Sequence, residues 1–198
     1  GSFADALNAL SPVRLPSLVP SALLSVALAP PFYVLLAQQA GGGDIADLGA
    51  LIIASGLASS VSAPIWGRLS DRSARLVMVL SAVLAGILGV ATWGLVQVDG
   101  ALLAHGLTFA VVYLLLAIAH AGVRLGRKVY LVDMASSETR AAMVAVSNTI
   151  IGIAMLGGGA IGLLGDIYGA AAVILLLGLA SVAAGLYALT LREVSEPA

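Results

Sequence analysis

Residues 48–98 read LGALIIASGLASSVSAPIWGRLSDRSARLVMVLSAVLAGILGVATWGLVQV. The runs 48–67 and 76–98 contain no Asp, Glu, Lys or Arg, and the charged stretch 68–75 separates them. A helix rises about 1.5 Å per residue, so a hydrocarbon core of about 30 Å needs about 20 apolar residues. Each run is long enough to cross a bilayer once, and the stretch between them predicts a short loop.

The same alternation of long apolar runs and short charged stretches covers the whole chain of 198 residues, which is 61% hydrophobic and 10% charged. The uncharged runs are 15–43, 48–67, 76–98, 100–123, 141–165 and 167–191. Each is long enough for one crossing and too short for two. The sequence therefore predicts an all-α membrane protein with six transmembrane helices.

The basic residues predict the orientation. If all six runs cross, every Lys and Arg lies on one side, and the opposite side carries only acids. Lys and Arg are enriched in cytoplasmic loops, so we expect both termini to be cytoplasmic and the protein to reside in the plasma or inner membrane. The basic residues are Arg14, Arg68, Arg72, Arg75, Arg124, Arg127, Lys128, Arg140 and Arg192.

Composition excludes several other functions. A formal net charge of −1 argues against a nucleic-acid partner, and the absence of Cys removes disulfides, thiolate metal sites and cysteine nucleophiles. The sequence contains no metal-ligand pair, no Ser-His-Asp arrangement and no intramembrane acid pair. We therefore expect no cofactor, no metal site and no enzymatic activity.

The segments at both ends differ from the spans in composition. Gly1-Ser2 without a methionine resembles the remnant of a cleaved tag, and residues 1–20 contain three prolines. We interpret 1–20 as this remnant followed by a linker or an interfacial segment. The remaining units are a first three-helix repeat at 21–99, a second at 100–192 and a cytoplasmic tail at 193–198.

The first loop motif runs from Gly67 to Arg75 and reads GRLSDRSAR. It resembles the G-x-L-a-D-r-x-G-r signature of the major facilitator superfamily, which follows the second helix of a six-helix half. Ala74 stands where the family usually has a second glycine. The resemblance implies that Gly67 permits a tight turn and that Asp71, with Arg72 and Arg75, takes part in a cytoplasmic gate.

A second element lies between the fourth and fifth spans. Tyr130 and Asp133, followed by Glu138 and Arg140, are similar to the family's Y-x-x-[DE]-x-x-P-x-x-x-R pattern, with Ser136 in place of the proline. The resemblance implies that these residues join the first loop in one charge network. Arg124, Lys128 and Arg192 also suit a simpler role as topology and headgroup anchors.

The resemblance also implies a fold. A six-helix half consists of two inverted three-helix repeats, and a complete member contains two such halves. The pattern G-x-L-x-D occurs at 67–71 and again at 162–166, on opposite membrane faces, as an inverted repeat requires. The proline-rich approach to the first span favours the C-terminal half. The expected partners are the lipid bilayer, a small-molecule substrate, and the complementary half or a second copy of the chain, giving an oligomer.

Polar residues inside the spans are candidates for a substrate cavity. The candidate lining residues are Tyr33, Ser55, Ser59, His105, Tyr113 and Asn148. Simpler roles remain open: small residues such as the serines often mark helix packing, and a histidine near a span end is often interfacial. No charged residue lies in the middle of a span, which favours an uncharged or amphipathic substrate.

Together these features predict half of a secondary active transporter that moves a small molecule by alternating access. The alternative is a membrane-helix assembly or folding module without transport activity of its own.

Overall fold

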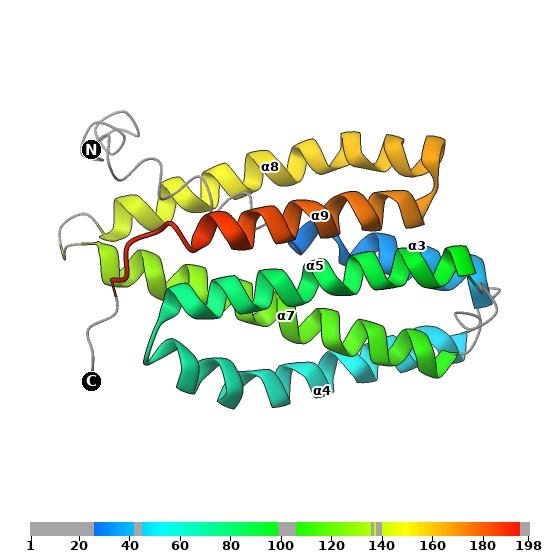
Figure 1. Cartoon of the computed structure of the whole chain (residues 1–198), viewed down its shortest axis with the longest axis horizontal. Coiled ribbons are helices and arrows are strands. Elements are labelled where there is room, and N and C mark those ends of the chain that lie inside the picture. The colour runs from blue at the N-terminus through cyan, green and yellow to red at the C-terminus, as the bar shows by residue number, and fades with distance from the viewer. Residues whose placement is uncertain (1–25, 42–44, 99–105, 136, 138–139, 195–198) are drawn as a thin grey trace.

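The computed structural model describes residues 26–41, 45–98, 106–135, 137 and 140–194, and regular structure in this part of the chain is entirely helical. A 3-10 turn, η1 (Val26–Leu28), leads into α3 (Pro30–Gly41). The longer helices are α4 (Ile45–Ser70), α5 (Ala74–Val98), α7 (Gly106–Met134), α8 (Arg140–Tyr168) and α9 (Ala170–Ala188), which run alongside one another in Figure 1. The expected segment 1–20 lies outside the described residues.

Within the described residues, four helices are long and apolar enough to cross a membrane: Gly49–Ser70, Ala74–Val98, Leu107–Met134 and Ala170–Ala188. The 12 residues of α3 span only about 18 Å, and the chain before η1 is not described. In α8 the apolar stretch found is Val144–Ile153. An all-helical membrane protein is thus confirmed, whereas six spans in two inverted repeats are not.

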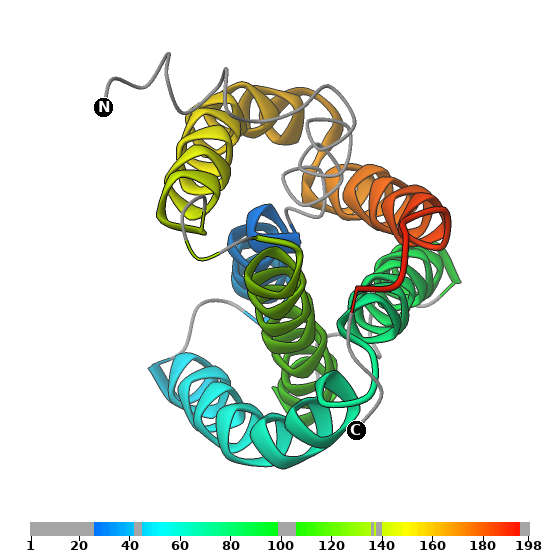
Figure 2. The same ribbon diagram turned by 90° about the vertical axis from the view of Figure 1, so that its left-hand side faces the viewer.

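The helices are arranged in three groups. Figure 2 shows α5 and α9 side by side, α3 and α7 in the middle, and α4 and α8 on the two flanks. The most extensive packing joins α5 to α9, α5 to α7 and α4 to α7, whereas α8 makes fewer contacts with its neighbours. α8 is consequently sparsely covered, and α4, which packs mainly against α7, leaves its other faces exposed.

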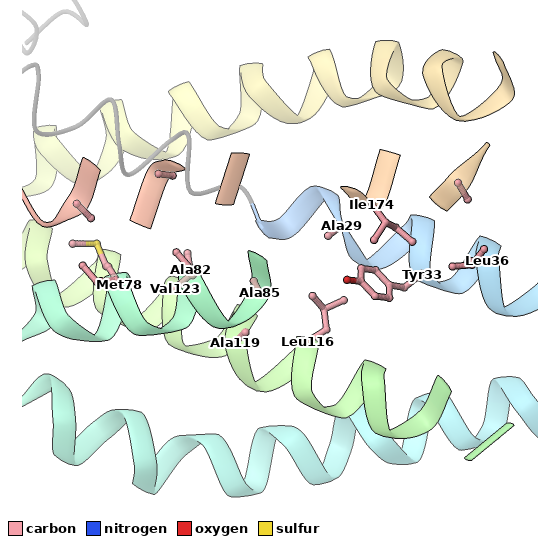
Figure 3. Packing of buried hydrophobic residues seen from close by; sticks show 14 of the residues in the cluster. Ala29, Tyr33, Leu36, Met78, Ala82, Ala85, Leu116, Ala119, Val123 and Ile174 are labelled. Atoms are coloured by element: carbon pink, nitrogen blue, oxygen red, sulfur yellow. The ribbon is translucent and has the colours of Figure 1, made fainter. Parts of the chain in front are cut away.

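The core lies where α3, α5, α7 and α9 meet. Tyr33 of α3 is 2% exposed and is surrounded by apolar side chains that include Leu116 of α7 and Ile174 of α9 (Figure 3). Met78 of α5 and Ala119 of α7 extend this core toward the end of the bundle that contains residues 71–73. Small residues dominate the remainder, which lets the helix backbones approach closely.

The closest approach joins α5 to α9 through glycines. A Cβ atom placed on Gly89 would lie 2.9 Å from both the Cα of Gly178 and the carbonyl oxygen of Ile174, which are backbone atoms. Neither can rotate away, so a side chain at Gly89 would force the two helices apart. Gly94, in the same helix, has no such neighbour within 4 Å.

Replacing Gly89 with alanine should therefore destabilise the protein although alanine favours helix formation. Overpacking of this kind costs about 1–3 kcal/mol. The matched Gly94→Ala variant should be neutral or slightly stabilising, because only the helix propensity changes there. Thermal unfolding in detergent would measure both, and equal midpoints for the two variants would contradict the close packing of α5 on α9.

Helix ends differ from the predicted loops in two places. α4 continues to Ser70, so Gly67 lies inside a helix and no tight turn requires it. α7 continues to Met134, so Arg124, Arg127 and Lys128 lie in its C-terminal half rather than in a loop. Arg and Lys favour helix formation, so these charges interrupt the apolar run without ending the helix.

Candidate functional site

One end of the bundle collects most of the charged residues. We call it the basic end; it comprises residues 68–75, the last two turns of α7, the start of α8 and the segment 189–194 after α9. The loop there is very short, because α4 ends at Ser70 and α5 begins at Ala74. Ser73 caps α5: its Oγ accepts a hydrogen bond of 3.0 Å from the backbone N–H of Leu76.

The segment after α9 is held by side chains from two other helices. The hydroxyl of Ser73 donates to Oε2 of Glu193 at 2.5 Å, and Nη1 of Arg75 donates to the carbonyl oxygen of Leu191 at 2.9 Å. The hydroxyl of Tyr130, in α7, donates to the carbonyl oxygen of Arg192 at 3.0 Å. We call this set the tail clamp; its members are Ser73, Arg75, Tyr130 and Glu193.

The clamp contains an ion pair between Nε of Arg75 and Oε2 of Glu193, 3.4 Å apart. The Nε atom is buried and forms no hydrogen bond with a described residue, so its interaction with Oε2 of Glu193 is electrostatic only. The two side chains are 29% and 35% exposed, and water weakens the attraction accordingly. The directed hydrogen bonds of the clamp therefore contribute at least as much as the ion pair.

Other members of the predicted charge network point away from the protein. Asp71, Arg72, Asp133 and Arg140 are exposed, and no described residue forms an ion pair with Asp71 or Arg72. Glu138 lies outside the described residues. The structure thus brings Arg75 and Tyr130 together through the tail and leaves Asp71 accessible at the tip of the loop.

A further polar contact joins α7 to α8 near the basic end. Nη1 of Arg127 donates to Oγ of Ser147 at 3.1 Å, and Ser147 is only 1% exposed. The bond gives the guanidinium a partner below the surface and fixes the start of the flanking helix α8. The neighbouring Asn148 faces outward and is exposed.

The structure does not gather the predicted cavity residues into one site. Tyr33 is buried in the core, Tyr113 is half-buried, and Asn148 is exposed on α8. Ser55 and Ser59 lie on α4, where the hydroxyl of Ser59 donates to the carbonyl oxygen of Ser55 at 3.0 Å. His105 lies outside the described residues. The described positions are therefore spread over α3, α4, α7 and α8.

A cleft of about 420 Å³ lies between α4 and α7. Its lining comprises Ser59, Ser62, Ala63, Trp66, Ala121, Arg124, Leu125 and Lys128. The indole Nε1 of Trp66 donates to the carbonyl oxygen of Ile118 at 2.8 Å, which ties the two helices together. Gly122 makes room for the ring, because a Cβ there would lie 2.7 Å from Cε2 of Trp66.

Sequence reasoning missed three residues that join separate elements: Ser73 and Glu193 at the basic end, and Trp66 in the cleft. Glu193 and Ser73 are separated by 120 positions in the chain, and no local pattern indicates that they touch. Trp66 sits in a run of apolar residues, with no local sign that its N–H reaches another helix. The missing signal is packing between helices: α5 against α9 brings the tail over the loop, and α4 against α7 brings Trp66 to Ile118.

Four apolar helices of bilayer length in the described part of the chain define an integral membrane protein. At one end of these helices, a charged loop is clamped to the tail. The sequence profile of the Major Facilitator Superfamily matches residues 19–198. The chain therefore belongs to the major facilitator superfamily, whose members are membrane transporters and not enzymes. No curated protein and no solved structure matches the chain.

Proposed function

We propose that the chain is one six-helix half of a secondary active transporter that moves a small molecule by alternating access. The six α-helices would each cross the bilayer, and α3–α5 and α7–α9 would be inverted repeats. The family match supports the general activity, and the arrangement of α4 and α8 on the flanks suits two related triplets. The prolines in residues 1–20 favour the C-terminal half.

The observation that supports the gating role is that residues 71–75, which form the loop and the start of α5, are of two kinds. Ser73 and Arg75 bind the tail of their own half, whereas Asp71 and Arg72 are exposed. A clamped loop holds Asp71 in a fixed position without neutralising it. Asp71 is then available to bind the complementary half, for example at a helix N-terminus, when the basic end closes.

The outer face of α4 supports a contact with a second bundle. A Cβ atom placed on Gly49, Gly56 or Gly67 would meet nothing within 4 Å. On the same helix, Ile52 and Leu57 are 73% and 55% exposed. Glycines allow another helix backbone to approach closely. We assign this face to the complementary half or to a second copy, and Gly67 then serves that contact rather than a turn.

We also propose that the basic end is cytoplasmic, with both termini inside the cell membrane. The described basic residues lie at this end or toward it along α7, and they include Arg68, Arg75 and Arg192. Asp166 lies near the opposite end, close to the last turn of α8. This distribution follows the positive-inside rule.

Solute uptake into proteoliposomes tests the proposed function. The complete transporter that contains these residues, driven by a proton or sodium gradient, should accumulate a solute from a panel of sugars, amino acids, nucleosides and amphipathic drugs. The isolated chain at the same density should show no uptake above empty vesicles, because one bundle has no second bundle to rock against. Uptake by the isolated chain would contradict the proposal, and no uptake by either would favour an assembly module.

A further inference from the structure

The cleft between α4 and α7 contains two cations that the proposed gate does not use. Arg124 and Lys128 are exposed, and among the described residues neither forms an ion pair. They are four residues apart, so they lie on the same face of α7, one turn from each other. Two unpaired cations at one cleft repel one another, and an anion between them would remove that repulsion.

The other polar groups of the cleft are already occupied. The hydroxyls of Ser59 and Ser62 donate to carbonyl oxygens of their own helix, at 3.0 Å and 3.4 Å, and the indole N–H of Trp66 donates to Ile118. The donors left for a ligand are therefore those of Arg124 and Lys128. The remaining wall is apolar: Ala63, Trp66, Ala121 and Leu125.

The cleft is also oriented relative to the bilayer. Trp66 lies beside Ile118 and Gly122 of α7, so Arg124, about one turn further along α7, is roughly level with the end of α4 at Ser70. Lys128 lies about 6 Å beyond that level, whereas Ser59 lies eleven residues, or about 16 Å, before it. Half of a hydrocarbon core is about 15 Å. With the end of α4 at the headgroups, both cations lie at headgroup depth, and the cleft extends from them toward the middle of the membrane.

We infer that this cleft binds an amphipathic anion, with its phosphate or carboxylate on Arg124 and Lys128 and its hydrocarbon chain along Trp66 and Leu125. A volume of about 420 Å³ suits a headgroup and the first methylenes of a chain. The ligand comes either from the adjacent leaflet, as an anionic phospholipid, or from solution, as a single-chain amphiphile. The inference requires membrane insertion and does not depend on transport.

Trp66 provides a direct probe, because it forms part of the cleft wall. The chain contains two tryptophans, so a Trp93→Phe variant reports from Trp66 alone. This variant would be placed in phosphatidylcholine vesicles containing brominated phosphatidylglycerol or, separately, brominated phosphatidylcholine at the same mole fraction. Bromine atoms quench a tryptophan that they contact. We expect the apparent association constant to be about 5–30-fold higher for the anionic lipid, as expected for 1–2 kcal/mol of preference.

Two further arms distinguish the source of the ligand. Dodecyl phosphate should displace the brominated anionic lipid, whereas inorganic phosphate at the same concentration should not, because it lacks the chain. If dodecyl phosphate alters Trp66 fluorescence and the anionic lipid shows no preference, the ligand is a soluble amphiphile. Equal quenching by the two lipids together with no effect of dodecyl phosphate would overturn the inference.

The variant Arg124→Gln/Lys128→Gln should abolish the preference, so that the two lipids have about the same apparent association constant. Its matched control is Arg68→Gln/Arg192→Gln, which also removes two exposed cations from the basic end but leaves the cleft intact. The control should keep most of the preference. A preference that survives in the cleft variant, or disappears equally in the control, would mean that general surface charge attracts the lipid and that the cleft has no role.

Discussion

Removing two members of the tail clamp should expose the tail to protease. In Arg75→Gln/Tyr130→Phe, the carbonyl oxygens of Leu191 and Arg192 lose their side-chain donors, and the ion pair with Glu193 is broken. Net hydrogen bonds contribute about 0.5–1.5 kcal/mol each, and the partly exposed ion pair adds about 0–1 kcal/mol. The total loss is about 1–4 kcal/mol, which raises the released population at least about fivefold.

Trypsin cleavage measures this population, because Arg192 supplies the cleavage site and the double variant leaves the tail sequence unchanged. When opening is fast relative to cleavage, the cleavage rate follows the open population. Release of the C-terminal peptide, followed by mass spectrometry, should accelerate accordingly. The control Arg68→Gln/Tyr168→Phe changes the same residue types outside the clamp and should be cleaved like the unaltered chain. Equal rates in all three proteins would show that the clamp does not hold the tail.

The second large effect concerns Asp71. If this carboxylate binds the complementary half when the basic end closes, Asp71→Asn removes a charged interaction from that state alone. Hydrogen bonds to charged groups contribute about 1.5–3 kcal/mol, and each 1.4 kcal/mol changes an equilibrium about tenfold. The complete transporter should therefore shift at least about tenfold toward the state that is open at the cytoplasmic side.

The shift is measurable without knowing the substrate. A cysteine at Asn148, which is exposed on α8, should react faster with an impermeant maleimide from the cytoplasmic side and more slowly from outside when Asp71→Asn is present. Asp166→Asn removes an exposed carboxylate near the opposite end and should leave the ratio of the two rates unchanged. An unchanged ratio of the two labelling rates in Asp71→Asn would show that Asp71 does not stabilise the state closed at the cytoplasmic side.

The sequence predicted the positions of the apolar helices well where charges coincide with loops. The uncharged run 76–98 differs from α5 by two residues at one end, and the run 48–67 lies inside α4. It failed for α7, which extends eleven residues past the end of the run at 123. Charged residues end an apolar run without ending a helix when water, headgroups or a partner such as Ser147 can receive them.

The candidate site could be predicted only in part, because a sequence shows local motifs but not contacts between distant helices. The motif around Asp71 is local, so its place between two helices follows from the sequence. The contact of this loop with Glu193 comes from packing between helices far apart in the chain, as does the cleft beside Trp66. The polar cavity residues were chosen by type and depth, and the structure distributes them over α3, α4, α7 and α8.

The most direct test of alternating access is two-sided labelling of Asn148→Cys in the complete transporter, without the Asp71 change. The chain has no native cysteine, so in a background free of other cysteines the signal comes from this position alone. Ile87 is 58% exposed on α5, and a cysteine there should react from neither side because lipid covers it. We predict that Asn148→Cys reacts with the impermeant maleimide from outside and, in inverted vesicles, from the cytoplasmic side, while the vesicles stay sealed. Reaction from one side only would contradict an alternating cavity and with it the assignment of this chain to a working half of a transporter.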